Sequence, residues 1–339
     1  MKVAISPSQK GYRSAPGLFR GQLVESHDSP ERLEALLAIV TDGGYTVCEA
    51  PAISRSLLES VHDVDFLQFL EHGPEEWHTL SGSTAPLMPN IFPTRHFPSR
   101  KTPHPLAKAG YYLGDTVTPL AGDTWAAIHG SASAAAHAAE LVLAGDLSAY
   151  ALCRPSGHHA HTDMAQGFCY LNNAAIAAAV ARSKHQRVAI IDIDVHHGNG
   201  TQQIFYDRSD VLVISLHADP AVAYPFFVGH EDEKGEGAGE GFNINIPLPK
   251  DTGDAVYLNE LDRALEKIRS FDPGMLVVSL GLDAHEADRL GIFKLTNSGF
   301  EEIARRIKAV GVPTVLIQEG GYTIPVIGSS LKAVLGTFR

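Results

Sequence analysis

The stretch "RVAIIDIDVHHGNGT" (residues 187–201) joins a hydrophobic run to a turn that contains two glycines. The run is rich in β-branched residues, as is typical of a strand that is covered on both faces of a sheet. It continues into Asp192, Asp194 and the adjacent pair His196 and His197. Polar groups at a buried strand end cost several kcal/mol unless something pairs with them. A metal ion is one such partner, so this stretch points to both a fold and a site.

Four other apolar runs of the same kind indicate strands, at residues 2–6, 211–217, 275–283 and 314–321. Helical patterns lie between the strands, at residues 29–44, 131–146, 172–184 and 298–311. Asn172 is a candidate cap for the third helix, and Ser298-x-x-Glu301 forms a capping box at the start of the fourth. Alternating strands and helices predict an α/β fold with one doubly wound, mostly parallel sheet and helices on both faces. We expect residues 1–339 to form a single domain.

Composition and charge restrict the function. The chain has 27 basic and 39 acidic residues, a net charge of −12, which disfavours a nucleic-acid-binding surface and tolerates a cationic small molecule. Three unevenly spaced cysteines, Cys48, Cys153 and Cys169, favour a reducing compartment. The first residues contain no signal-peptide pattern, and no apolar stretch reaches membrane-spanning length. We therefore expect a cytoplasmic protein that does not bind membranes.

Residues 73–110 interrupt the alternation with seven of the 20 prolines of the chain. So many prolines leave little room for a long helix or a central strand. The segment nevertheless carries Trp77, Ile91, Phe92 and Phe97, which a disordered linker would rarely do. We expect an ordered loop whose apolar side chains pack against a partner surface.

The strand ends provide candidate metal ligands. In an extended strand, Asp192, Asp194 and His196 share one face, because they are two residues apart. Asp283 follows the strand at 275–283 and is a third candidate, with His285 and Asp288 as nearby competitors. Oxygen and nitrogen ligands of this kind suit Zn²⁺ or a similar divalent ion. The alternative is ordinary: solvated strand ends and an acidic helix cap.

Two further motifs provide groups for acid–base chemistry. In "RPSGHHAH", His158 and His159 are adjacent and His161 follows. A neutral histidine there can take a proton from a metal-bound water and return it to a leaving group. In "QEGGY", a flexible Gly320–Gly321 hinge presents Tyr322, whose phenol can donate to a developing oxyanion. Each motif alone has an ordinary structural explanation, but together they indicate metal-assisted hydrolysis.

The set "RPSGHHA", "GFCYLNNAA", "DIDVHHGNGT", "SLGLDAH" and "EGGY", in this order along the chain, resembles the zinc-dependent histone deacetylase family. Within this family, the sequence is most similar to the bacterial acetylpolyamine amidohydrolases. The resemblance runs through essentially the whole chain and implies the fold that arginases and deacetylases share. It also implies a hydrolase that removes acetyl groups from acetylated polyamines or similar small amines.

The resemblance assigns a role to each motif residue. It makes Asp194, His196 and Asp283 the ligands of one zinc ion per subunit. It makes His159 the general base and acid, and His158 an electrostatic partner that Asp192 orients. Asn199 supports His159 at a position where many eukaryotic relatives have aspartate, a change that should alter the basicity of the histidine. Tyr322 polarises the scissile carbonyl.

The resemblance also implies a substrate channel and a second ion. Phe168 and Tyr224 match its aromatic walls, with Phe226 and Phe227 as alternatives for the second wall. The backbone carbonyl of Gly167 meets the substrate amide. A site for K⁺ or another monovalent cation would use Asp192, Asp194, His196, Ser215 and Leu216.

The segment at 73–110 resembles the insertion through which the polyamine enzymes dimerise and narrow their channel, so we expect a homodimer and a small cationic acetylamide substrate. The sequence departs from the pattern at two acidic positions, which are Gly17 and Leu106 here. The acidic stretch at 229–241 is a candidate replacement for them. Three alternatives stay open: a lysine deacylase that acts on proteins or peptides, a manganese ureohydrolase that resembles arginase, and a metal-binding module without activity.

Overall fold

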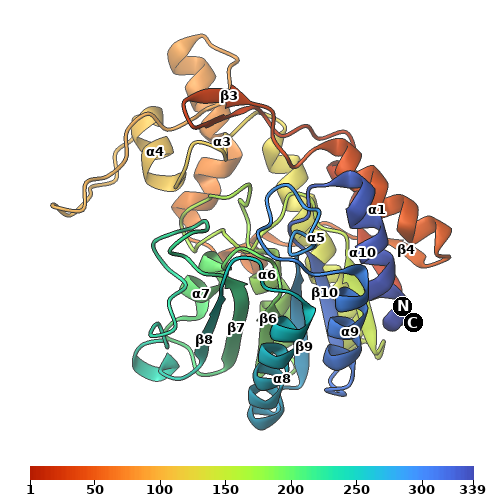
Figure 1. Cartoon of the computed structure of the whole chain (residues 1–339). Helices are drawn as coiled ribbons and strands as arrows, with labels where there is room; N and C mark the ends of the chain where they lie inside the picture. The colour runs from red at the N-terminus through yellow and green to blue at the C-terminus, as the bar shows by residue number, and fades with distance from the viewer.

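The computed structural model describes residues 1–339. Its main sheet has eight strands in the order β4-β1-β5-β10-β9-β6-β7-β8, and every neighbouring pair is parallel. The strands are β1 (Lys2–Ile5), β4 (Thr46–Glu49), β5 (Ser148–Ala151), β6 (Val188–Asp192), β7 (Val211–Ala218), β8 (Asn243–Leu248), β9 (Met275–Leu280) and β10 (Thr314–Gln318). Figure 1 shows this sheet with helices on both sides. The predicted doubly wound parallel sheet is confirmed.

Ten helices surround the sheet, and a separate two-stranded hairpin lies at one end of it (Figure 1). The hairpin is β2 (Gly17–Phe19) and β3 (Gln22–Val24). The helices are α1 (Pro30–Asp42), α2 (Arg55–Glu59), α3 (Val64–Ser81), α4 (Pro105–Tyr112), α5 (Thr124–Leu143), α6 (Asn173–Arg182), α7 (Asn199–Phe205), α8 (Asp254–Phe271), α9 (Asn297–Lys308) and α10 (Ile324–Thr337). No helix is both long enough and apolar enough to span a membrane.

The sheet separates two hydrophobic cores, because alternate strand residues point to opposite faces. On one face, side chains such as Ile190 and Val277 pack with α5 and α6 in a cluster of 42 buried residues. On the other face, Ile191 and Val278 pack with α1, α8, α9 and α10 in a cluster of 38. Burial on both faces explains why the central strands are apolar at nearly every position.

All five predicted strands form, but β4, β5 and β8 of the main sheet and the hairpin strands β2 and β3 were not predicted. β4 is an edge strand with exposed side chains, and β5 has only four residues, three of them small. β8 alternates Asn and Ile and contains Pro247, which an edge strand tolerates. Asn172 caps α6 as predicted, since its side chain accepts a hydrogen bond from the Ala175 amide.

The predicted capping box at Ser298 is wrong. Thr296 is the N-cap of α9, and its hydroxyl accepts from the Gly299 amide at 3.1 Å. Ser298 lies inside the first turn. A threonine cap satisfies the same free amides, so the helix begins two residues before the position that the motif predicted.

The expectation that residues 73–110 have little room for a long helix is wrong at the start of the segment, where α3 continues, and a short helix, α4, forms at its end. α3 continues to Ser81 with Pro74 inside it, because its buried face (Phe66, Leu67, Phe69, Leu70) outweighs the lost hydrogen bond. α4 begins at Pro105, where a missing N–H costs nothing. Trp77 packs on the hydrophobic core of its own chain and not on a partner surface.

Candidate active site

The carboxyl ends of β6, β9 and β10 meet at one edge of the sheet, because these strands are parallel neighbours. Asp194 and His196 follow β6, and Asp283 follows β9. One ligand atom from each of these residues lies within 4.8 Å of the other two. The His196 Nδ1 is 3.1 Å from the Asp194 Oδ1 and 3.3 Å from the Asp283 Oδ2. The structure therefore brings together the three predicted ligands.

The chemistry of this triad fits a divalent cation. Both carboxylates are fully buried, and the Asp283 Oδ2 has no hydrogen-bond partner. Burial first, and then the charge of Asp194, raise the pKa of Asp283 to about 6. When both are ionised, two buried carboxylates held this close together are stabilised by a positive charge between them. Glycine at Gly320 is also needed, since a Cβ there would overlap both carboxylates.

Asp288 and His285, the two alternative ligands, make other contacts. The Asp288 Oδ2 accepts from the amides of Tyr322 and Thr323, and its Oδ1 accepts from the Leu290 amide. The His285 ring stacks on Phe300. Asp288 therefore holds the loop that carries Tyr322 and does not face the triad.

The histidine pair lies beside the triad with two different supports. The His158 Nδ1 is 2.9 Å from the Asp192 Oδ2, and the His159 Nδ1 donates to the Asn199 Oδ1 at 2.7 Å. Burial lowers the pKa of His158, but Asp192 and Asp194 outweigh it and raise the value to about 10. Burial and then the charges of His158 and His196 hold the pKa of His159 well below its usual range. The pair therefore combines a charged and a neutral imidazole.

A third histidine orients Asn199. The His161 Nε2 accepts from the Asn199 Nδ2 at 3.0 Å and from the Gln166 Nε2 at 2.8 Å. This contact fixes the amide so that its oxygen faces His159. Gly167 lies directly against the His159 ring, where a Cβ would overlap it. The sequence showed His161 but gave no indication of this role.

Tyr322 lines the same cavity as His159 and His196, and its hydroxyl makes no hydrogen bond with the protein. Burial and then Asp283 hold its pKa well above the usual value, so it stays a phenol that can donate. The predicted flexible hinge is wrong, because Gly320 and Gly321 are buried and the Gly320 amide donates to the Asp194 Oδ2 at 2.8 Å. A side chain at Gly321 would collide with Leu282. These glycines allow close packing rather than motion.

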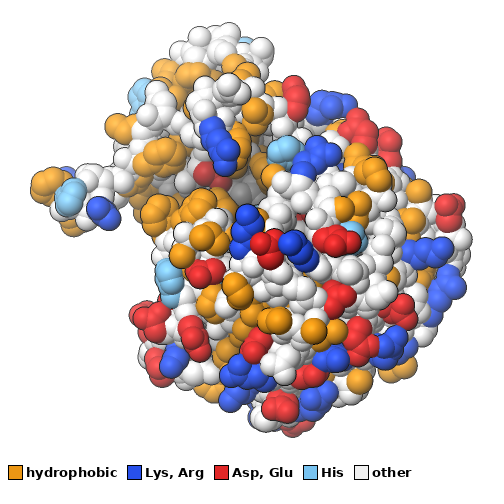
Figure 2. Space-filling view, in the orientation of Figure 1, with side chains coloured by type: hydrophobic (Ala, Val, Ile, Leu, Met, Phe, Trp, Pro, Cys, Tyr) orange, Lys and Arg blue, Asp and Glu red, His pale blue; other side chains and the backbone are white.

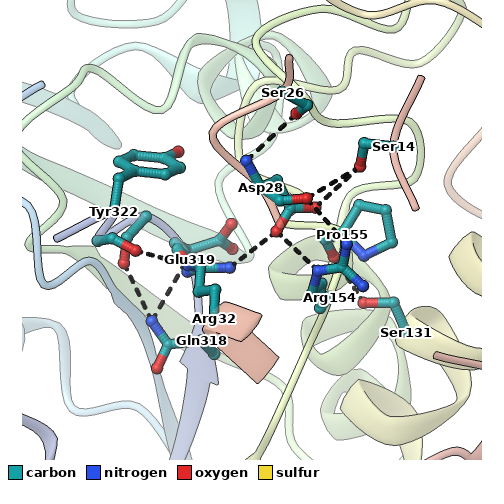
Figure 3. Close-up of polar contacts among 12 residues, drawn as sticks. Ser14, Ser26, Asp28, Arg32, Ser131, Arg154, Pro155, Gln318, Glu319 and Tyr322 are labelled. Carbon is teal, nitrogen blue, oxygen red and sulfur yellow. Dashed lines mark hydrogen bonds and ion pairs between the residues drawn. The ribbon is translucent and has the colours of Figure 1, made fainter. Parts of the chain in front are cut away.

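A buried polar network lies beneath Tyr322 (Figure 3). Arg32 donates to the carbonyls of Gly321 and Glu319, and its guanidinium lies 5.4 Å from the centre of the Tyr322 ring. Asp28 accepts from both Arg32 and Arg154, and all three side chains are buried. The network joins the start of α1 to the loops after β5 and β10.

Glu319 connects the tyrosine loop with the histidine loop. Its Oε2 accepts from the amides of Gly157 at 2.7 Å and His158 at 3.1 Å. The residue is fully buried, and burial raises its pKa to about 7. Neither Glu319 nor the arginines below it were predicted as site residues, because their partners are far away in the sequence.

A cavity of about 560 Å³ leads from the surface to this group of residues. His159, His196 and Tyr322 line its inner end, together with Gly167, Phe168 and Tyr224. The Tyr224 ring lies 4.9 Å from the His159 ring, and the Phe168 ring lies 5.9 Å from the Tyr322 ring. Both predicted aromatic walls therefore border the cavity. Phe226 also lines it, whereas Phe227 is 88% exposed and does not.

Asp115 fixes both sides of this channel and was not predicted. Its Oδ2 accepts from the Gly167 amide at 2.7 Å and from the Tyr224 hydroxyl at 3.2 Å. Thr118, three residues later, accepts from the Phe168 amide at 3.0 Å. Phe168 has a φ of +67°, so these two contacts hold it in a conformation that non-glycine residues rarely adopt.

The residues of the predicted monovalent site lie on neighbouring strands. Ser215 on β7 pairs with Asp192 on β6, and Leu216 follows. Asp194 and His196 come directly after the carboxyl end of β6.

The two positions at which the polyamine enzymes have acidic residues lie in different places in this structure. Gly17 lines the cavity, and Leu106 packs on the core from α4. None of the acidic residues at 229–241 lines the cavity, so this stretch does not replace them.

Two buried carboxylates, an imidazole, a histidine pair and a phenol at the inner end of a channel define a metal-dependent amide hydrolase. The sequence model of the histone deacetylase domain matches residues 26–338, and the chain belongs to the histone deacetylase family. It is accordingly a deacetylase of the hydrolase class.

Its relatives are similar over their full length. An acetylpolyamine amidohydrolase of Burkholderia pseudomallei (strain 1710b) is 40% identical, with 100% of this chain and 98% of the relative aligned. Acetylpolyamine amidohydrolase 1 of Pseudomonas aeruginosa is 42% identical over 94% of this chain and 93% of the relative. The crystal structure of an acetylpolyamine aminohydrolase from Burkholderia pseudomallei matches with a TM-score of 0.95 at 40% identity, covering 100% of this chain and 98% of that one.

Proposed function

We propose that the protein hydrolyses the amide bond of small acetylated amines, the class that includes the acetylpolyamines for which its relatives are named. The observation that carries this proposal is the convergence of the triad, His159 and Tyr322 at the inner end of one narrow, aromatic-walled cavity. We also propose that the whole chain acts as one catalytic domain and that it works in the cytoplasm.

The side chains divide the reaction between them. His159 is neutral, and its Nδ1–H is bound to Asn199, so its Nε2 is free to accept a proton from the attacking water. The same nitrogen then returns the proton to the departing amine. Tyr322 donates its hydroxyl to the carbonyl oxygen as negative charge develops there. His158, held charged by Asp192, adds positive charge beside the triad.

Asp194, His196 and Asp283 would hold the metal, for which zinc is our proposal because two carboxylates and one imidazole leave room for water and substrate. A divalent cation supplies Lewis acidity for the carbonyl and lowers the pKa of water. We further propose that Asp192, Asp194, His196, Ser215 and Leu216 bind K⁺ or another monovalent cation. Phe168 and Tyr224 would align the chain of the substrate, and the Gly167 carbonyl would accept its amide N–H.

The alternative functions are less well supported. A ureohydrolase with two metals needs additional carboxylates, but Asp192 and Asp288 are both occupied by hydrogen bonds. A binding module without activity has no use for a neutral histidine and an unpaired phenol beside the metal ligands. A deacylase that acts on proteins shares this chemistry, so only the width of the entrance separates it from our proposal.

A substrate panel tests the proposed function. The metal-loaded protein is assayed with acetylputrescine, acetylspermidine and acetyl-lysine peptides, and release of acetate is measured. We expect turnover of the small amides to exceed that of the peptides. Turnover of peptides alone would favour the protein deacylase, and no acetate from any compound would contradict an amidohydrolase.

The exposed part of the 73–110 segment leads to a prediction about assembly. Ile91, Phe92 and Phe97 are 64, 46 and 74% exposed, which is costly unless another molecule covers them. We propose that they form a homodimer contact that narrows the entrance. Replacing all three by serine should produce a monomer in light scattering and raise the peptide-to-amine activity ratio.

Leu147 is 83% exposed outside this segment, so Leu147→Ser is the matched control and should change neither result. A triple variant that stays dimeric with an unchanged activity ratio would contradict the gatekeeping role. A change of molar mass without a change in the peptide-to-amine activity ratio would mean that the segment serves dimerisation and does not select substrates.

Asn199→Asp tests whether the hydrogen bond from His159 to Asn199 sets the pKa of the general base. A carboxylate at the Nδ1 of His159 stabilises the protonated ring, so the pKa of His159 should rise. His159 must be neutral to accept a proton, and the acidic limb of kcat/KM against pH should therefore move to higher pH. Asn199→Ser, which adds no charge, is the control. An unmoved limb in the aspartate variant would remove His159 from the role of base.

A further inference from the structure

The outer part of the active-site cavity has a charge pattern that does not suit a polycation. The charged residues that line it, apart from histidines, are Arg20, Glu25 and Arg289. Two positive charges therefore face one negative charge, and most of the remaining lining is apolar. Figure 2 shows Lys and Arg, Asp and Glu, and hydrophobic side chains around the hollow on this face.

Arg20 lies in the turn of the hairpin and lines the cavity. It lies with Gly21 between β2 and β3, and both residues have positive φ, at +50° and +78°. The hairpin is fixed to the channel wall, because the Leu18 amide donates to the Thr116 carbonyl at 2.8 Å and the Thr116 hydroxyl donates back to the Leu18 carbonyl. The guanidinium lies 5.1 Å from the centre of the Phe19 ring and forms no ion pair.

Arg289 is attached to the loop that carries Tyr322. Its amide donates to the Thr323 hydroxyl at 3.0 Å, and its neighbour Asp288 accepts from the amides of Tyr322 and Thr323. Its charge reaches the cavity: burial and then Arg289 lower the pKa of His27, whose ring lies 6.4 Å from the Tyr322 ring. Like Arg20, Arg289 forms no ion pair within the chain, so both guanidinium groups are free to bind a ligand.

We propose that Arg20 and Arg289 form an anion-binding subsite, which selects acetylated amines whose far end carries a carboxylate over acetylated polycations. The preferred substrates are then ω-acetamido carboxylates and N-acetylated amino acids. This inference rests on the proposed amide hydrolysis at the inner end of the same cavity and specifies what the outer end accepts. Arginine suits a carboxylate because its planar fork donates two parallel hydrogen bonds.

Local charge should outweigh net charge in this selection. The chain carries −12 overall, but exposed charges more than about 8 Å away are largely screened at physiological salt. The acidic stretch at 229–241 does not line the cavity, so it lies outside the surface that the substrate contacts. The charged groups that line the cavity should therefore act on the far end of a bound substrate more than the net charge does, and two of these three groups are arginines.

A matched substrate series tests the subsite. The compounds 4-acetamidobutanoate, N-butylacetamide and acetylputrescine share the acetamide and a four-carbon chain, but end in an anion, a neutral group and a cation. We expect the metal-loaded enzyme to prefer the anion over the cation by about tenfold in kcat/KM, mainly through KM, and to lose this preference at high salt. Arg20→Glu and Arg289→Glu should each lower the preference by about threefold, and together reverse it.

Arg269→Glu is the matched control, because it makes the same change in charge at the end of α8, on the opposite edge of the sheet from the site. It should leave the order of substrates unchanged. A wild-type preference for acetylputrescine, or equal effects of Arg269→Glu and Arg20→Glu, would overturn the subsite.

Binding of the three compounds by calorimetry separates this inference from the proposed function. If none is hydrolysed, the proposed function fails, and the order of binding affinity still decides the subsite. If all are hydrolysed but the cation binds and reacts best, the amidohydrolase stands and the anion-binding subsite is wrong.

Discussion

His159→Ala and Tyr322→Phe are expected to lower turnover by about 10²-fold or more, equivalent to about 3 kcal/mol of transition-state stabilisation, while metal content stays normal. Neither residue belongs to the triad of ligands, so the metal has no reason to leave. His159 is the neutral imidazole at the cavity, and Tyr322 presents an unpaired phenol there. Tyr322→Phe keeps the ring and removes only the donor.

The comparison with His158 sharpens this result. His158→Ala removes a positive charge that Asp192 and Asp194 hold beside the triad, so it should also reduce turnover. It should not abolish the acidic limb of the pH profile, because His159 remains. His72→Ala, at an exposed position on α3, and Tyr45→Phe, directly before β4, are controls that should react normally. Near-normal turnover in His159→Ala or Tyr322→Phe would remove that residue from its role.

The parts of the fold that were predictable are those in which one segment carries its own signal. Central strands such as β6 and β9 are buried on both faces, so their sequences are apolar at nearly every position and can be recognised as strands. β5 is equally buried, but it has only four residues, three of them small, and this is too short a pattern to indicate a strand. Pro74 in α3 shows the opposite case, where packing of the helix face outweighs a local signal against the helix.

In the candidate site, too, some residues could be predicted from the sequence and others could not. Asp194, His196 and Asp283 were predictable because parallel strands place their carboxyl ends at one edge, whatever the distance in sequence. Asp115 and Glu319 act through backbone amides about 50 and 160 residues away, and only the folded chain shows these contacts. Glu319 even stands in a motif that the sequence singles out, but its neighbours there are glycines and a tyrosine, and none of them is the group that it binds.

Substitution of the triad has the second large expected effect. Asp194→Ala, His196→Ala and Asp283→Ala should each reduce metal content strongly and bring turnover to background, because each removes one of three ligands. Elemental analysis and acetate release measure the two results. Full metal occupancy with normal turnover in all three variants would contradict the assignment. Asp288→Ala, which removes a nearby carboxylate outside the triad, should retain metal.

The metal-free protein provides an independent test in its stability. In the folded state the pKa of Asp283 is raised to about 6 from an ordinary value of 3.8, so between these values the folded chain binds more protons than the unfolded chain. Its contribution to stability is therefore present below pH 4 and is lost as the pH rises toward 6. Asp283→Asn removes this loss, and the variant should gain stability relative to metal-free wild type across this window, by a few kcal/mol at most.

Added zinc should reverse the order of stability by stabilising only the wild type, because a cation bound by the native triad opposes unfolding. Chemical denaturation at pH 4, 5, 6 and 7, with and without zinc, measures both differences. A constant difference between the two proteins across this range would mean that Asp283 does not carry the uncompensated charge for which a metal is needed.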